Sequence, residues 1–328
     1  MLIPYYKEYW TVSPSPNTND WKLPVGQTRV SLTDLLNMQQ QLLPAGVLTQ
    51  KGAKSFLLGL HQSRLRGRGM EFDQVRLYQS GDDIRTIDWR VTARTGEPHS
   101  KIFQEEREHP VFLVVEQSPA MFFASTGNFK SVQAAYMASL VAWAAQANHD
   151  RVGGLVFSAS AFQHIRPQRH QRGTLRLLNV LAEANQALTQ PQSNNGNQQQ
   201  LLLALHYCSR QPRPGSLIVL ICDERNLSDE SEALLLALAK RFDLILVPVS
   251  DPMEQHLPPA GDLLFQEDRK FLRLNNSLIN LNKSWQRRHW RRRQQWQRLA
   301  QHAGLALIPL STSGSLLSQL TALQHTEG

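Results

Sequence analysis

Short apolar runs alternate with longer amphipathic or Ala-rich segments along the last two thirds of the chain. The runs have the length of buried strands, and the segments between them have the length of helices. We expect strands at 111–115, 151–157, 161–165, 217–222, 244–249 and 305–310, and helices at 130–147, 173–188, 229–241 and from about 314. Such alternation is typical of a parallel sheet that helices cover on both faces. The sequence therefore predicts an α/β fold with a doubly wound, mostly parallel sheet.

The remainder of the chain has a different character. Residues 1–58 hold scattered prolines and asparagines and one helical pattern at 31–46, which predict an N-terminal arm with a short helix. Residues 59–107 are polar, charged and rich in glycine, and we expect an ordered irregular segment with short strands there. Residues 108–328 carry the alternating pattern, which a low-complexity stretch at 190–200 interrupts as an expected mobile loop.

Composition favours a folded globular protein, because 41% of the residues are hydrophobic and 19% are charged. The two cysteines, Cys208 and Cys222, provide neither a disulfide framework nor the spacing of a zinc site. The first residues lack the basic start and apolar run of a signal peptide, and no run of 18 apolar residues occurs. We therefore expect a cytoplasmic protein without a transmembrane helix.

Most of the net charge of +8 lies in one segment, 283–298, which has seven basic side chains and no acidic one. On a helical wheel Arg287, Arg291 and Arg298 share one face. A separate apolar stripe contains Leu278, Leu281, Trp285, Trp296, Leu299 and Ala303. The pattern favours an amphipathic helix that packs on the sheet and exposes its basic face. The alternative is an anion-binding helix for nucleic acid, a membrane surface or an acidic protein, with Trp290 able to stack on bases.

Acidic and basic residues are interleaved in the segment 59–107. The acids are Glu71, Asp82, Asp83 and Asp88, and the neighbouring arginines are Arg76, Arg85, Arg90 and Arg94. Arginine and carboxylate groups can pair through two hydrogen bonds, which would hold an irregular loop in one shape. This favours a structural network. A partner-recognition surface is the main alternative, and a catalytic carboxylate pair is the least favoured.

This segment resembles the family called domain of unknown function 58, a group of bacterial von Willebrand A-like proteins. The residues that carry the resemblance are Gly59, His61, Ser63, Gly67, Gly69, Glu71, Phe72, Arg76, Tyr78, Gly81, Asp82, Asp83, Arg85, Ile87, Asp88, Trp89, Thr92, Ala93, Arg94, Lys101, Glu105 and Glu106. The resemblance implies a von Willebrand A-like fold and a non-enzymatic role in protein interaction. It also implies a MoxR-type AAA+ ATPase as the partner, with other von Willebrand A-like proteins as further candidates.

The resemblance also raises the question of a metal-ion-dependent adhesion site. Such a site has an Asp-x-Ser-x-Ser loop after the first strand, and later loops add a Thr and an Asp. Its oxygen ligands suit Mg²⁺. Here Glu116 stands at the first position, Ser118 matches, and Ala120 replaces the second Ser, while Thr174 and Asp223 are the candidates for the later ligands. We therefore expect a degenerate site, with Mg²⁺ as the one cofactor that the pattern leaves open.

The four candidate ligands are expected at the carboxyl ends of the parallel strands, where doubly wound sheets bind ligands. Asp251 and Glu254 follow the strand at 244–249 and should lie at the same edge. Motifs of serine hydrolases, zinc proteases and phosphate-binding loops are absent from the sequence. Non-enzymatic protein binding is therefore the favoured function. Binding of nucleic acid or another anionic surface by 283–298 comes second, and a metal-dependent hydrolase is the least favoured.

Overall fold

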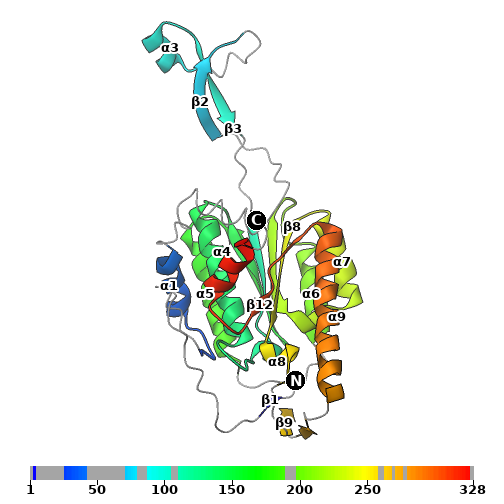
Figure 1. Cartoon of the computed structure of the whole chain (residues 1–328). Coiled ribbons are helices and arrows are strands. Elements are labelled where there is room, and N and C mark those ends of the chain that lie inside the picture. Colours follow the sequence, from blue (N-terminus) through cyan, green and yellow to red (C-terminus); the bar gives the residue numbers. More distant parts are fainter. Residues whose placement is uncertain are drawn as a thin grey trace. The chain divides into compact units, whose positions relative to one another are not determined.

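The structure is a computed structural model that describes residues 3–4, 26–42, 71–79, 87–104, 110–188, 197–257, 262–267, 270–275 and 279–325. The chain divides into two compact units (Figure 1). The larger unit contains Met1–Ser63 and Pro110–Gly328, and the smaller unit is Arg64–His109. Each unit has its own sheet, so the two are described separately.

A seven-stranded sheet forms the centre of the larger unit. Its strands follow the order β11 (Ala306–Leu307), β8 (Asp243–Ser250), β7 (Leu217–Asp223), β4 (Val111–Glu116), β5 (Val152–Phe157) and β6 (Phe162–Gln168), and β12 (Leu310–Ser311) also pairs with β8. All neighbouring pairs are parallel except β5 with β6, which is antiparallel. The expectation of a mostly parallel sheet in an α/β fold is confirmed.

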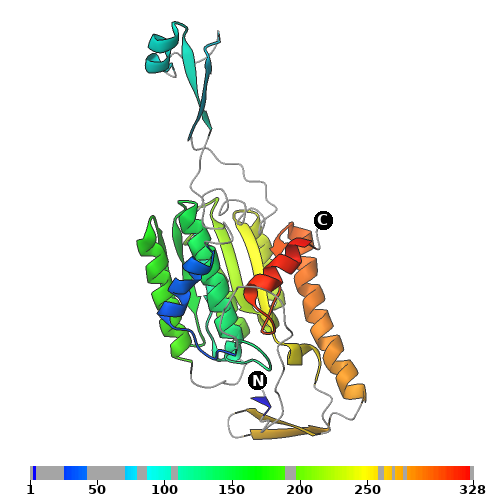
Figure 2. The same cartoon turned by 60° about the vertical axis from the view of Figure 1, so that its left-hand side comes forward.

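Helices cover both faces of this sheet, as Figures 1 and 2 show. The helices over one face are α1 (Leu32–Leu42), α4 (Lys130–Ala147), α5 (Gln171–Gln186) and α10 (Leu316–His325), and those over the other are α6 (Asn197–Cys208), α7 (Asp229–Ala239) and α9 (Ile279–Ala303). Successive side chains of a strand point to opposite faces. Leu113 and Val115 of β4 therefore join the first core, and Phe112 and Val114 join the second. A strand buried on both faces needs apolar side chains at every position, which explains the uninterrupted run in β4.

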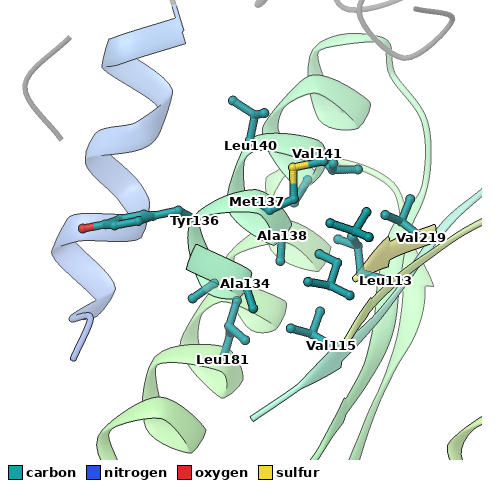
Figure 3. Close-up of a cluster of buried hydrophobic side chains, with 14 of the residues drawn as sticks. Leu113, Val115, Ala134, Tyr136, Met137, Ala138, Leu140, Val141, Leu181 and Val219 are labelled. Atoms are coloured by element: carbon teal, nitrogen blue, oxygen red, sulfur yellow. The ribbon is translucent and has the colours of Figure 1, made fainter. Parts of the chain in front are cut away.

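The helix α4 is the centre of the first core, and its residues from Lys130 to Ala145 are all buried. Many of them are alanine or serine, so neighbouring elements can approach closely. Figure 3 shows Met137, Ala138 and Val141 of α4 packed toward Leu113 and Val219 of the sheet.

The opposite side of α4 packs against α1 through polar bonds as well as apolar contact. Ser139 Oγ and Trp143 Nε1 of α4 donate hydrogen bonds of 2.8 and 3.0 Å to the Leu35 carbonyl of α1. Tyr136 points toward α1 (Figure 3), and its hydroxyl binds the side chain of Gln27. The predicted helix near 31–46 is therefore a structural layer over α4.

The smaller unit contains an antiparallel pair of strands, β2 (Glu71–Leu77) and β3 (His99–Gln104), and the helix α3 (Trp89–Thr95). Asp88 caps α3, because its Oδ1 accepts hydrogen bonds of 3.0 and 3.2 Å from the backbone N–H groups of Arg90 and Val91. Gly96 ends the helix with φ of 81°, a left-handed conformation that suits glycine. Short strands within the polar segment are thus present as expected.

Some elements differ from the sequence prediction. Residues 197–200, expected in a mobile loop, begin α6, because Leu201, Ala204 and Leu205 supply an apolar face that packs in the second core. Residues 190–196 lie outside the described residues. The strand expected at 305–310 is split into β11 and β12, because Pro309 cannot donate a backbone hydrogen bond.

A hairpin follows β8 in the chain. It consists of β9 (Asp262–Glu267) and β10 (Lys270–Asn275), which pair antiparallel, with β1 (Ile3–Pro4) added along β9.

Candidate functional site

Buried polar side chains gather where the parallel strands β4, β7 and β8 end. Glu116 is the last residue of β4 and Asp223 the last of β7, and both are fully buried. Because β4 and β7 are parallel neighbours, their carboxyl ends meet at one edge of the sheet. Ser118 and Glu254 lie in the same cluster. The structure thus brings Glu116, Ser118 and Asp223 together, as the sequence predicted.

Internal donors bind both carboxylate oxygens of Glu116. Ser118 Oγ donates to Oε1 at 2.6 Å, and the backbone N–H of Asp223 donates to Oε2 at 2.9 Å. The Asn226 amide lies 2.8 Å from each oxygen. Burial, and then the nearby charge of Asp223, raise the pKa of Glu116 to about 7 although these hydrogen bonds oppose the rise.

Lys130 provides a buried cation at the start of α4. Its Nζ lies 2.7 Å from Asp223 Oδ2 and 2.8 Å from Glu254 Oε1, and its side chain is fully buried. Lys130 is therefore held between two carboxylates from different strand ends. The sequence prediction did not connect Lys130 with Asp223, which lies 93 positions further along the chain.

Arg225 is the second cation of the cluster. Its Nε lies 2.9 Å from Asp223 Oδ1, and a terminal guanidinium nitrogen binds Oδ2, so the pair is bidentate. The same Nε lies 3.3 Å from Glu254 Oε1. Burial by itself would raise the pKa of Asp223, but the charges of Arg225 and Lys130 outweigh it and lower this pKa well below its usual range. Asp223 is therefore a permanently ionised partner of two cations.

These contacts do not fit a magnesium site. A metal ion needs lone pairs on the carboxylates, and here those of Glu116 and Asp223 are directed at Asn226, Lys130 and Arg225. The ammonium group of Lys130 stands where a cation bridging Asp223 and Glu254 would stand, and it would repel Mg²⁺ in a site with little water. Across the described parts of the chain, no group of three or more His, Cys, Asp or Glu side chains is placed to hold a metal ion.

Thr174 is not part of this cluster, and its prediction as a ligand is wrong. The preceding Gly173 lies against the carbonyl of Val152, where β5 begins, whereas Phe157 at the other end of β5 pairs with Glu116. Val152 and Phe157 are five residues apart, and a strand rises about 3.3 Å per residue, so Thr174 lies about 16 Å from the cluster. The helix α5 runs opposite to the strands, so its other end reaches the cluster edge, where Asn185 Nδ2 donates to Gln117 Oε1 at 2.9 Å.

A second polar group closes the same edge around Asp251. Its carboxylate accepts hydrogen bonds from the backbone N–H and Oγ of Ser125, at 2.7 and 2.6 Å, and from Thr312 Oγ1 at 2.6 Å. Asp251 and Glu254 also form a capping box on α8 (Pro252–Gln255). Asp251 thus ties the end of β8 to the segments that follow β4 and β12, which is a structural role.

Of the residues in the signature segment, Asp82, Asp83 and Arg85 lie outside the described residues. Glu71 and Arg76 are on β2, and Arg94 is exposed in the last turn of α3. Asp88 caps a helix, so its carboxylate is partly engaged by the backbone. Trp89, one of the signature residues, is 67% exposed, and Leu77, which the sequence prediction did not single out, is 52% exposed.

The basic segment lies on α9. Arg287, Arg291 and Arg298 are exposed, and Trp296 and Leu299 are buried in the second core. Leu278 lies outside the described residues, and Trp285 and Ala303 are only half-buried. Within the described residues, no helix is apolar over a length that could cross a membrane.

Contacts on the buried side of α9 attach it to the cluster edge. Trp296 Nε1 donates to the carbonyl of Glu224 at 2.9 Å, and His289 Nδ1 lies 3.5 Å from Glu224 Oε2. Burial raises the pKa of Glu224 to about 7. The pKa of His289 is lowered to about 4, mainly by burial and then by the positive charges of Arg293 and Arg292. His289 is therefore neutral at pH 7, and its contact with Glu224 is not an ion pair.

Comparison with known proteins yields relatives without an assigned function. Proteins of Mycobacterium bovis and Mycobacterium tuberculosis, each named only as uncharacterized, are 29% identical over 211 residues. This alignment covers 64% of the chain and 64% of each of these curated relatives, so it spans less than two thirds of their length. A solved structure, the conserved hypothetical protein BatB from Bacteroides thetaiotaomicron, aligns with 66% of the chain and 95% of its own length, at 18% identity and a TM-score of 0.39.

The family match covers more than half of the chain. Residues 74–299 match the family described as "Protein of unknown function DUF58". This range contains the cluster at the ends of β4, β7 and β8, the second half of β2, all of β3, and most of α9. The chain belongs to the DUF58 family.

Proposed function

We propose that the chain is a non-enzymatic protein-interaction module with a von Willebrand A-like fold. Its partner is a MoxR-type AAA+ ATPase, in a chaperone-like or assembly role, with other von Willebrand A-like proteins as further members of the assembly. The cluster of Glu116, Asp223 and Lys130 carries this proposal. Its carboxylates are bound by side chains of the chain itself, which leaves no lone nucleophile, base or metal ligand among them.

The cluster supports binding rather than chemistry because it fixes the shape of an edge. Lys130 and Arg225 neutralise Asp223 and Glu254, and Asn226 joins Glu116 to the segment after β7. Three strand ends are thereby locked without a metal ion. A partner would dock on this edge by shape and charge, and a partner carboxylate would not need to complete a coordination shell.

The smaller unit supports a second contact with the partner. Trp89 is 67% exposed and Leu77 is 52% exposed, and large exposed apolar side chains are typical of protein-binding surfaces. The neighbouring Arg94 is exposed as well. Both free cysteines, Cys208 and Cys222, are buried thiols, which is consistent with the cytoplasmic location that this function requires.

The proposal is tested by capture of a purified MoxR-type AAA+ ATPase on the immobilised chain. The wild type should retain the ATPase, and Trp89→Ala should weaken binding about 30-fold, the effect of losing an interface tryptophan. Arg94→Glu should also reduce capture. Leu203→Ala is the control, because Leu203 is 47% exposed but lies on α6 in the larger unit.

Thermal unfolding separates a loss of ATPase binding from a loss of folding. Trp89 and Arg94 are exposed, so their replacement should leave the thermal unfolding midpoint within about 2 °C of the wild type. If the folded wild type retains no ATPase, or if both variants retain it as well as the wild type does, the proposed partnership or the proposed surface is wrong.

A further inference from the structure

Basic side chains form a straight row along the exposed face of α9. Lys283, Arg287, Arg291 and Arg298 are all exposed and follow one another at intervals of four or seven residues. At 100° per residue these intervals keep the four side chains on one side of the helix, over a length of about 22 Å. Trp290 borders this row and is 59% exposed.

A groove lies beside this row, between α9 and α7. These two helices pack against each other (Figure 1). It has a volume of about 200 Å³. Its lining consists of Glu232, Trp290, Arg291, Gln294, Gln295 and Arg298. Gln295 Nε2 donates to Glu232 Oε2 at 2.9 Å, so the wall on the α7 side is held in place. The groove has the size for one large side chain, and Trp290 and two arginines lie at its rim.

The charges around the groove favour a protein segment over a nucleic acid. The first turn of α7 carries Asp229, Glu230 and Glu232, and the first two are exposed. A polyphosphate laid across α9 would meet these carboxylates, and like charges at an interface exclude a partner. A peptide can place carboxylates along the basic row only and turn an uncharged side toward α7.

We propose that this face of α9 binds an acidic protein segment with one large apolar side chain. Its carboxylates pair with Arg287, Arg291 and Arg298, and its apolar side chain enters the groove beside Trp290. Carboxylates four residues apart on a helix have the spacing of Arg287 and Arg291. This surface would bind such a segment whether or not the chain also binds an AAA+ ATPase.

The test measures binding of a fluorescent helical peptide of about 20 residues by anisotropy. The peptide carries glutamates at every fourth position and one leucine, and a single-stranded oligothymidine of similar length serves as the second probe. The peptide should bind more tightly than the oligonucleotide at about 0.15 M salt, and its affinity should fall as salt rises. Tighter binding of the oligonucleotide would overturn the choice of a protein partner.

Variants of the full chain locate the site. Replacing Arg287, Arg291 and Arg298 together by Gln should weaken peptide binding about tenfold, since each exposed ion pair contributes a factor of about two to three. The matched control replaces Arg166, Arg172 and Arg210 by Gln, because these exposed arginines lie on other elements and give the same change in net charge. Equal losses in both triple variants would show a general charge effect and would reject this site.

Trp290→Ala tests the contribution of the groove separately from that of the basic row. This change keeps every charge, so it should weaken the peptide about tenfold while leaving the salt dependence unchanged. A peptide in which alanine replaces the leucine should bind the wild type and the Trp290→Ala variant alike. If the wild type and Trp290→Ala show the same difference in affinity between the leucine and the alanine peptide, the apolar side chain does not occupy the groove and the proposal fails.

Discussion

Replacing Lys130 by Met tests the internal cation at the end of the sheet. Methionine keeps most of the buried hydrocarbon but removes the ammonium group that lies 2.7 Å from Asp223 and 2.8 Å from Glu254. Arg225 remains bound to Asp223 and lies 3.3 Å from Glu254, so about one buried negative charge loses its partner. Breaking a buried ion pair from one side costs about 3–5 kcal/mol. We therefore expect the free energy of unfolding to fall by about 4 kcal/mol.

Urea unfolding, followed by circular dichroism at pH 7, measures this change. Adding Glu254→Gln to Lys130→Met should recover part of the loss, because the second change removes the carboxylate charge that the first leaves unpaired. Lys283→Met is the matched control; Lys283 is exposed, and its replacement should alter stability by less than about 0.5 kcal/mol. A loss below about 1 kcal/mol in Lys130→Met, or no recovery in the double variant, would refute the role of Lys130 in neutralising these carboxylates.

Three further predictions concern the same sheet. Burial raises the pKa of Glu116 from its usual 4.5 to about 7, so its contribution to stability is complete below pH 4.5 and is lost as the pH rises through 7. The free energy of unfolding of the wild type should therefore fall by about 3 kcal/mol between these pH values, and Glu116→Gln should abolish this fall. Urea unfolding that shows the same pH dependence for both proteins would contradict this. Millimolar Mg²⁺ should leave the thermal midpoint of the wild type unchanged, whereas a rise of several degrees in a melting scan would indicate a metal site. Gly154→Ala should prevent stable folding, because the added methyl group would lie 2.2 Å from the carbonyl oxygen of Leu113, while Ser160→Ala at an exposed turn should not alter the melting curve.

The sequence predicted the sheet well because burial on both faces demands a distinctive pattern. β4 and β7 consist of uninterrupted apolar residues up to their final Glu116 and Asp223, so both the strands and their polar ends were recognisable. The edge strands were harder to predict. Pro309 divides the last apolar run into two short pairings with β8, which hydrophobicity alone does not indicate.

The site was only partly predictable because its charges come from distant segments. Glu116 and Asp223 could be placed at one edge, since parallel strands share a direction. Thr174 was misplaced because it begins a helix that runs opposite to the strands, so the end of α5, and not its start, reaches that edge. Lys130 was missed although it carried a signal, namely a single charged residue in the otherwise uncharged helix 130–147.

The helix α1 has a consequence for how this protein can be shortened. The family match begins at residue 74, yet Leu35 and Met38 of α1 are fully buried, and the Leu35 carbonyl binds Ser139 and Trp143. A polypeptide trimmed to residues 74–299 would expose the outer side of α4 to water and would also lose β11 and β12 from the sheet. Domain limits drawn from the family match would therefore cut through the hydrophobic core, and the folding unit of the larger part includes sequence on both sides of the match.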